Sequence, residues 1–61
     1  MKTAAITPVN NVPDYAKDTR FWVVTRNEDE FWFYGAWDDE KRAKDVAKKI
    51  EGYVLMNIKY I

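Results

Sequence analysis

Acidic side chains form two clusters in this sequence that could take part in chemistry. The first cluster is Glu28-Asp29-Glu30 and the second is Asp38-Asp39-Glu40. Neighbouring carboxylates can bind a divalent cation or share acid–base work in hydrolysis. Neither cluster has the spaced oxygen ligands of an EF-hand loop, and the sequence has no His or Cys with which to build a zinc site. We therefore predict no metal ion and no cofactor.

Catalysis also lacks its usual participants. The sequence offers no His or Cys as base or nucleophile, and its two glycines, Gly35 and Gly52, cannot make a Gly-rich phosphate loop. Catalytic carboxylates need a cleft that separates their pKa values, and a 61-residue chain gives little room for one. We predict no catalytic residues and no enzymatic activity.

Basic and aromatic residues together suggest another chemistry, the stacking of single-stranded bases. Residues 38–51 carry five basic side chains, but they also carry five acidic ones, and the whole chain is balanced at ten of each. A surface that follows phosphates is net positive, so nucleic acid is not the expected partner. A small single-stranded nucleic-acid-binding module, with Trp22, Trp32 and Tyr34 as stacking platforms, stays open as an alternative.

Three segments have the composition of β-strands. Residues 20–26 and 30–37 are rich in β-branched and aromatic types, and the short polar turn between them predicts a hairpin. Residues 53–60 alternate between a wholly apolar set and a mixed set, which predicts a third strand with one face on a core.

One amphipathic helix is predicted between the second and third strands. Asp38 is a suitable N-cap, and Gly52 is placed to close the helix at its C-terminal end. Between them, apolar residues recur at the helical spacing of three and four, at Ala43, Val46, Ala47 and Ile50.

The order strand–strand–helix–strand predicts an α+β domain. A right-handed crossover through the helix places the third strand beside the first. The expected fold is a three-stranded antiparallel sheet (ββαβ, order 2-1-3) with one helix packed on one face. We assign residues 20–61 to this domain and residues 1–19 to an irregular N-terminal arm, in which Ala4–Val9 could add an edge strand and Asp14–Asp18 one helical turn.

The hairpin is apolar on both faces, although one narrow helix can cover only one of them. The helix is expected to cover Phe21, Val23, Phe31 and Phe33, together with Val54, Met56 and Ile58. A predicted spare face then remains, consisting of Trp22, Val24, Trp32, Tyr34, Tyr53 and Leu55. Exposed apolar patches of this kind mark interaction sites. Three occupants stay open: the chain's own arm, a second copy, or a foreign partner.

The small size of the chain favours a second copy as the partner that covers the spare face. Domains below roughly 70–80 residues usually need a disulfide, a metal or a partner subunit. Without Cys or His, the expected staple is heavy aromatic packing or oligomerisation, and a homodimer is the oligomer that we expect. No apolar run approaches a membrane span, and the N-terminus lacks the apolar core of a signal peptide. We therefore predict a cytoplasmic protein without a membrane partner.

One stretch resembles a known family. The residues Phe33-Tyr34-Gly35-Ala36-Trp37, followed by Ala43, Ala47 and Ile50-Glu51-Gly52-Tyr53, are similar to the strand, helix and Gly-Tyr run of peptidoglycan-binding SPOR domains. The resemblance covers about a third of the chain and implies a glycan binder. SPOR domains contain two β-α-β halves and are exported, whereas this sequence predicts one helix and no export signal.

The function that the sequence favours is a small non-enzymatic protein–protein interaction module. In size the chain also looks like the very short proteins of bacteriophages and mobile elements, many of which inhibit a host protein by binding it. We therefore expect a homodimer that could act as such an inhibitor, with the nucleic-acid module and the SPOR-like glycan binder as alternatives.

Overall fold

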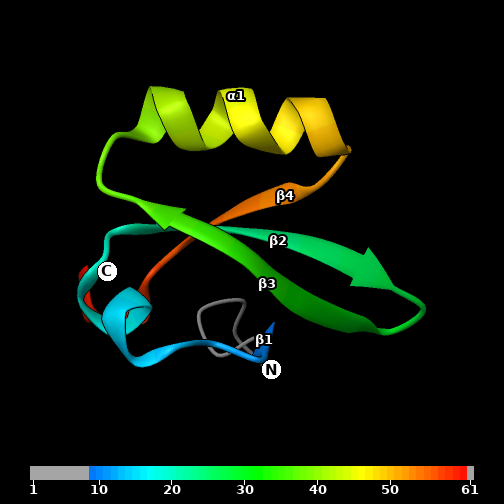
Figure 1. Cartoon of the computed structure of the whole chain (residues 1–61), viewed down its shortest axis with the longest axis horizontal. Coiled ribbons are helices and arrows are strands. Elements are labelled where there is room, and N and C mark those ends of the chain that lie inside the picture. The colour runs from blue at the N-terminus through cyan, green and yellow to red at the C-terminus, as the bar shows by residue number, and fades with distance from the viewer. Residues whose placement is uncertain (1–8, 61) are drawn as a thin grey trace.

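The computed structural model describes residues 9–60, apart from the side chain of Ile58. Its centre is a four-stranded sheet, with helix α1 (Glu40–Ile50) on one face and the short 3-10 helix η2 (Asp14–Asp18) on the other (Figure 1). The predicted α+β class is confirmed.

The hairpin forms the middle of the sheet. Strands β2 (Phe21–Asn27) and β3 (Glu30–Trp37) pair antiparallel, and a two-residue turn joins them. Glu28 in this turn has a left-handed backbone with φ of 59°. Strand β4 (Tyr53–Met56) pairs antiparallel with β2 on the other side. The predicted central position of the first hairpin strand is therefore confirmed.

A fourth strand corrects the predicted three-stranded antiparallel sheet. Strand β1 (Val9–Asn10) pairs parallel with β3, so the sheet is mixed and has the order β1-β3-β2-β4. The edge strand predicted at Ala4–Val9 lies outside the described residues except at Val9. The helical turn predicted at Asp14–Asp18 is confirmed as η2.

A β-bulge in β3 changes which side chains share a face. Val23 pairs with Gly35, but the next residue, Val24, pairs with Phe33, so Tyr34 is an extra residue without a partner in β2. Side chains alternate between faces along a strand, and an extra residue reverses the alternation beyond it. Phe33 therefore lies on the face of Val24, away from α1.

The bulge makes two predicted positions wrong. Phe31 pairs with Arg26 and lies, like Phe33, on the face opposite α1, although both rings were expected beneath the helix. The register confirms Val54 and Met56 on the helix face, because they pair with Val23 and Phe21. The side chain of Ile58, predicted on the same face, lies outside the described part of the structure.

Local side-chain chemistry fixes the start of α1. Asp39 is the N-cap, and its carboxylate accepts a hydrogen bond of 3.0 Å from the backbone N–H of Lys41. The predicted cap, Asp38, instead accepts a bond of 3.1 Å from the backbone N–H of Arg20 and ties the helix start to β2. Glu40 and Lys44 form an ion pair of 3.3 Å along the exposed side.

The end of α1 departs from the predicted glycine cap. The left-handed residue is Glu51, with φ of 57°, while the N–H of Gly52 donates to the carbonyl of Ala47 at 2.8 Å. Gly52 is required for a different reason: a methyl group there would lie 2.5 Å from the carbonyl oxygen of Val24. Its absent side chain lets the chain pass directly over β2 into β4.

The third predicted strand is shorter than expected. It ends at Met56, and the chain continues through Asn57 into the 3-10 helix η3 (Ile58–Tyr60) rather than extending to residue 60. The backbone N–H of Asn57 still donates to Arg20 at 2.7 Å, which is the last bond between this segment and β2.

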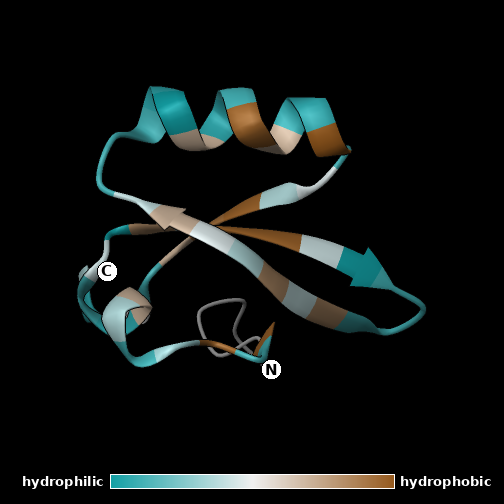
Figure 2. Ribbon diagram, viewed as in Figure 1, coloured by the Kyte–Doolittle hydropathy of each residue, from teal (hydrophilic) through white to brown (hydrophobic). Residues whose placement is uncertain are grey.

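The core beneath α1 is made of small residues. The helix turns its apolar stripe toward the sheet and its hydrophilic side outward (Figure 2). Ala43 and Val23 are fully buried there, and the rings of Phe21 and Trp37 border them.

Within the described part of the chain, no helix is long and apolar enough to cross a membrane.

Candidate interaction surface

The face of the sheet opposite α1 carries most of the aromatic side chains that contact one another. We call it the aromatic underside and define it by Tyr15, Trp22, Phe31, Phe33 and Tyr53. The sheet register places the last four on this face, because Trp22, Val24 and their partners in β3 and β4 alternate away from the helix. Tyr15 reaches it from η2.

The rings of the aromatic underside meet edge to face. Phe33 contacts Tyr15 at 6.3 Å and Trp22 at 6.2 Å between ring centroids, with interplanar angles near 80°. Phe31 contacts Tyr53 in the same way at 5.8 Å. This geometry aligns the positive edge of one ring with the negative face of the next. Val24 lies on the same face and is fully buried.

Trp22 connects this face to the arm. Its indole N–H donates a hydrogen bond of 2.7 Å to the carbonyl of Ala16, and Ala16 itself is fully buried. The amphipathic indole therefore has its apolar body packed and its polar group satisfied. Trp22 and Val24 were both predicted on the spare face: Trp22 contacts the chain's own arm, and Val24 is fully buried on the same face.

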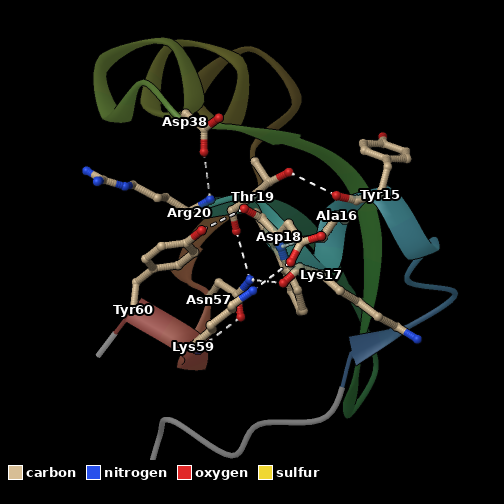
Figure 3. Close-up of polar contacts among 11 residues, drawn as sticks. Tyr15, Ala16, Lys17, Asp18, Thr19, Arg20, Asp38, Asn57, Lys59 and Tyr60 are labelled. Atoms are coloured by element: carbon tan, nitrogen blue, oxygen red, sulfur yellow. Dashed lines mark hydrogen bonds and ion pairs between the residues drawn. The ribbon is translucent and has the colours of Figure 1, made fainter.

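Asn57 holds the arm in this position. Its side-chain amide donates hydrogen bonds of 2.8 and 2.9 Å to the carbonyls of Lys17 and Thr19 (Figure 3). Its side-chain oxygen accepts a hydrogen bond of 3.2 Å from the backbone N–H of Lys59. Asn57 is only 4% exposed, so these bonds satisfy a polar group that would otherwise be buried at a cost.

Exposed groups continue the same attachment. Lys59 and Asp18 form an ion pair of 2.6 Å, and the Tyr60 hydroxyl donates to the Asp18 carbonyl at 2.8 Å (Figure 3). The Arg20 guanidinium lies 5.5 Å from the centroid of the Tyr60 ring. We call the contacts of Asp18, Asn57, Lys59 and Tyr60 the polar clasp.

The ion pair of the clasp shifts the pKa values of both Asp18 and Lys59. The hydrogen bond and the charge of Lys59 lower the pKa of the Asp18 carboxyl, and the same contacts from Asp18 raise the pKa of the Lys59 ammonium. Both groups lie at the surface, where water screens their attraction.

Coverage by the arm is incomplete, and several rings stay open to solvent. On the aromatic underside, Tyr15 is 64% exposed and Tyr53 is 49% exposed. Phe31 and Phe33 are half-buried. This part of the face is apolar, contiguous and accessible, which is the character of a contact surface.

The six residues of the predicted spare face do not form one exposed surface. Trp22, Val24, Tyr53 and Leu55 share the underside, although the first two are covered. Trp32 pairs with Thr25, so it lies on the helix side of the sheet. Tyr34 is the bulge residue. Both rings are exposed, at 41% and 55%.

Phe31, Phe33, Tyr15 and Asn57 were missing from the predicted site. Gly35 was the available signal for the two phenylalanines, since an isolated glycine in a strand often marks a bulge. A methyl group at Gly35 would lie 2.5 Å from the Trp37 ring, which occupies that space. Asn57 could have been noticed as the polar residue inside an otherwise apolar strand pattern.

The acidic clusters have structural partners. Asp38 and Asp39 accept hydrogen bonds from backbone N–H groups, and Glu30 accepts a hydrogen bond of 2.7 Å from the side-chain amide of Asn10. Across the described residues, no group of three or more potential metal ligands comes together. An open hollow beside α1 is lined mainly by Asp and by Lys or Arg, and these charged side chains are all exposed to solvent.

No family model matches this chain, and neither the curated proteins nor the solved structures contain a match to it. The similarity to SPOR domains therefore rests on the quoted residues and stays a prediction.

Proposed function

We propose that this protein is a small non-enzymatic protein–protein interaction module that binds its partner through the open part of the aromatic underside. The contact residues are Tyr15, Phe31 and Tyr53, with Phe33 beneath them. Binding to a host protein by a mobile-element inhibitor, in the cytoplasm, is the form of this activity that the sequence favours.

One observation carries the proposal. The largest side chains that are fully buried are two valines, Val23 and Val24, whereas Tyr15 and Tyr53 on the aromatic underside are 64% and 49% exposed. A marginal domain gains most from burying its rings. Rings left in water by a chain of this size are better explained by a partner, because Tyr and Trp are enriched at interface cores.

The same geometry weakens the nucleic-acid alternative. Base stacking along a strand needs rings arranged on one accessible face. Trp22 is covered by the arm, and Trp32 lies on the helix side of the sheet. The three proposed platforms therefore do not form one surface.

The proposal is tested by capturing partners from a cell lysate with the immobilised protein and quantifying the retained proteins. Tyr15→Ala and Tyr53→Ala remove exposed rings from the underside, and each should reduce a specific partner's retention at least tenfold, as hot-spot residues do.

Trp32→Ala and Tyr34→Ala are the matched controls, because they remove equally exposed rings that lie elsewhere. They should leave retention within about twofold. Equal losses for all four variants, or no protein retained specifically by the wild type, would contradict the proposal. Circular dichroism of each variant checks that the fold is intact.

A further inference from the structure

Strand β4 is an unprotected edge of the sheet. It is the last strand in the order β1-β3-β2-β4, and nothing in the described residues pairs with its outer side. The strand Tyr-Val-Leu-Met has no charge, proline or bulge, the devices by which soluble proteins prevent edge pairing. Tyr53 and Met56 at its ends are both about half exposed.

The ladder with β2 decides which backbone groups point outward. Asn57 donates its N–H to the carbonyl of Arg20 at 2.7 Å, so these two residues form a hydrogen-bonded pair. Bonded pairs alternate along antiparallel strands. Leu55 and Tyr53 therefore bond β2, while Val54 and Met56 direct their N–H and C=O groups to the open side.

The opposite edge of the sheet is protected. β1 covers Phe31 and Trp32 of β3, and the bulge at Tyr34 interrupts the remaining length. A bulge twists an edge away from regular pairing. The two edges of the sheet therefore differ in protection. Among the described strands, only the β4 edge offers a regular row of unpaired backbone N–H and C=O groups.

The occupant with the best fit is a second copy of the same edge. A two-fold axis perpendicular to the sheet brings two β4 strands together antiparallel and keeps like faces together, so only residues from the same face pair. Both faces of β4 are apolar, with Val54 and Met56 on one side and Tyr53 and Leu55 on the other. Each side therefore meets an apolar equivalent.

The small core supplies the reason for association. Within the described residues, the fully buried side chains are no larger than valine, and a domain of this size commonly needs a partner subunit. A paired edge adds backbone hydrogen bonds and cross-strand apolar contacts to both copies.

We propose that the protein forms a two-fold symmetric homodimer by antiparallel pairing of β4 with β4 of a second copy, giving one eight-stranded sheet. Val54 pairs with Val54 of the other copy through hydrogen bonds in both directions, and Tyr53 lies opposite Leu55. The undersides of the two copies then form one continuous surface. The β4–β4 interface is distinct from the foreign-partner contact proposed above, apart from Tyr53 at its border.

Sedimentation velocity from about 1 to about 500 µM tests the dimer, since small interfaces dissociate in this range. The wild type should convert to dimer across the series. Val54→Pro removes an outward N–H without removing a bond to β2, and Met56→Lys adds an edge charge to an exposed side chain. Each variant should weaken dimerisation at least tenfold.

Tyr34→Lys places the same charge at the opposite edge and should dimerise as the wild type does. A wild type that stays monomeric to the highest concentration overturns the proposal, and so does equal weakening by Tyr34→Lys and Met56→Lys. Met56→Lys leaves the backbone unchanged, so this variant decides the test if Val54→Pro does not fold.

Cross-linking tests the register, because the chain contains no cysteine of its own. Paired residues in antiparallel strands have Cα atoms about 4.5–5.5 Å apart, within disulfide range. Val54→Cys should form a covalent dimer on mild oxidation, at least tenfold faster than Tyr34→Cys. Faster coupling of Tyr34→Cys overturns the β4 edge, and faster coupling of Leu55→Cys overturns the register centred on Val54.

The outcomes separate the dimer from the proposed partner binding. Met56→Lys leaves Tyr15 and Phe31 in place, so it should weaken dimerisation at least tenfold while partner retention from lysate persists. Tyr15→Ala should reduce retention and leave the sedimentation of the dimer unchanged.

Discussion

The two faces of the sheet are stabilised in different ways. Beneath α1, small residues such as Val23, Ala43 and Ala47 are closed off from water by an eleven-residue helix. On the other face, large rings are partly covered by the five-residue helix η2, which hydrogen bonds to Trp22 and Asn57 hold in place. Apolar packing is the main contact on the first face, whereas the second depends on polar attachment and keeps apolar area open.

This difference separates stability from recognition within one thin sheet. Changes beneath α1 should alter folding, because the side chains there are buried against the helix. Changes on the aromatic underside should alter how much ring surface is available, with smaller costs in stability. Three measurements test this division.

The largest expected effect comes from deleting one ring on each face. Phe21→Ala empties the core beneath α1 and should lower the free energy of unfolding by about 3–5 kcal/mol. Phe31→Ala removes a half-buried underside ring and should cost roughly 1 kcal/mol. Urea denaturation followed by circular dichroism measures both.

A domain of this size has a stability of only about 3–9 kcal/mol at typical values per residue. Phe21→Leu, which keeps most of the apolar volume, is therefore measured alongside Phe21→Ala. If Phe31→Ala costs as much as Phe21→Ala, the underside is a second core and the division of roles is wrong.

Loss of the polar clasp should have an intermediate effect. Asn57→Ala leaves the carbonyls of Lys17 and Thr19 without their donor and should cost about 1–3 kcal/mol. Amide hydrogen exchange should quicken in η2 and stay slow in α1, because only the arm is released. Asn10→Ala, which removes an exposed amide bonded to Glu30, is the control and should change stability by less than about 0.5 kcal/mol. Uniformly faster exchange would mean that the arm and the domain unfold together.

The smallest effect concerns the Asp18–Lys59 ion pair and depends on pH. The pKa of Asp18 is lowered in the folded state, so its contribution is present above the ordinary carboxyl pKa and is lost as pH falls through the folded value. The pKa of Lys59 is raised, so its contribution is present below the ordinary ammonium pKa and is lost as pH rises through the folded value.

Denaturation of the wild type and Asp18→Asn across pH 2–11 tests this pair. The wild type should be slightly more stable near neutral pH, and the difference should shrink at both extremes. Asp14→Asn is the control, since its contact with Lys17 lies within one turn of η2. A difference that persists unchanged at acid pH would show that the Asp18 charge does not hold the arm.

Sequence patterns predicted the elements of the helix side well. The stripe containing Ala43 and Ala47 sufficed for α1, and strand composition with crossover handedness sufficed for the central position of β2. These features depend on local periodicity and on general chirality, both of which can be read from the chain.

The underside could not be predicted as well, because it depends on one inserted residue and on distant polar contacts. Because Tyr34 is an extra residue in β3, the rings before it lie on the opposite face from the one that strict alternation predicts. Strict alternation therefore wrongly placed Phe33 beneath the helix. Asn57 bonds to residues about forty positions away, a separation at which neighbouring sequence gives no guidance. The predicted division into an arm of residues 1–19 and a domain of residues 20–61 stays a prediction.

The clasp also imposes an order on events during synthesis. The arm leaves the ribosome before the side chain that secures it, because Asn57 is 40 residues later than its partner Lys17. The β2–β3 hairpin contacts are shorter in sequence and can form earlier. Until Asn57 emerges, the arm lacks the amide that bonds to Lys17 and Thr19, and the bond of Trp22 to Ala16 is the polar contact that can hold it over the rings. The arm is therefore secured late in synthesis, after the hairpin whose rings it borders.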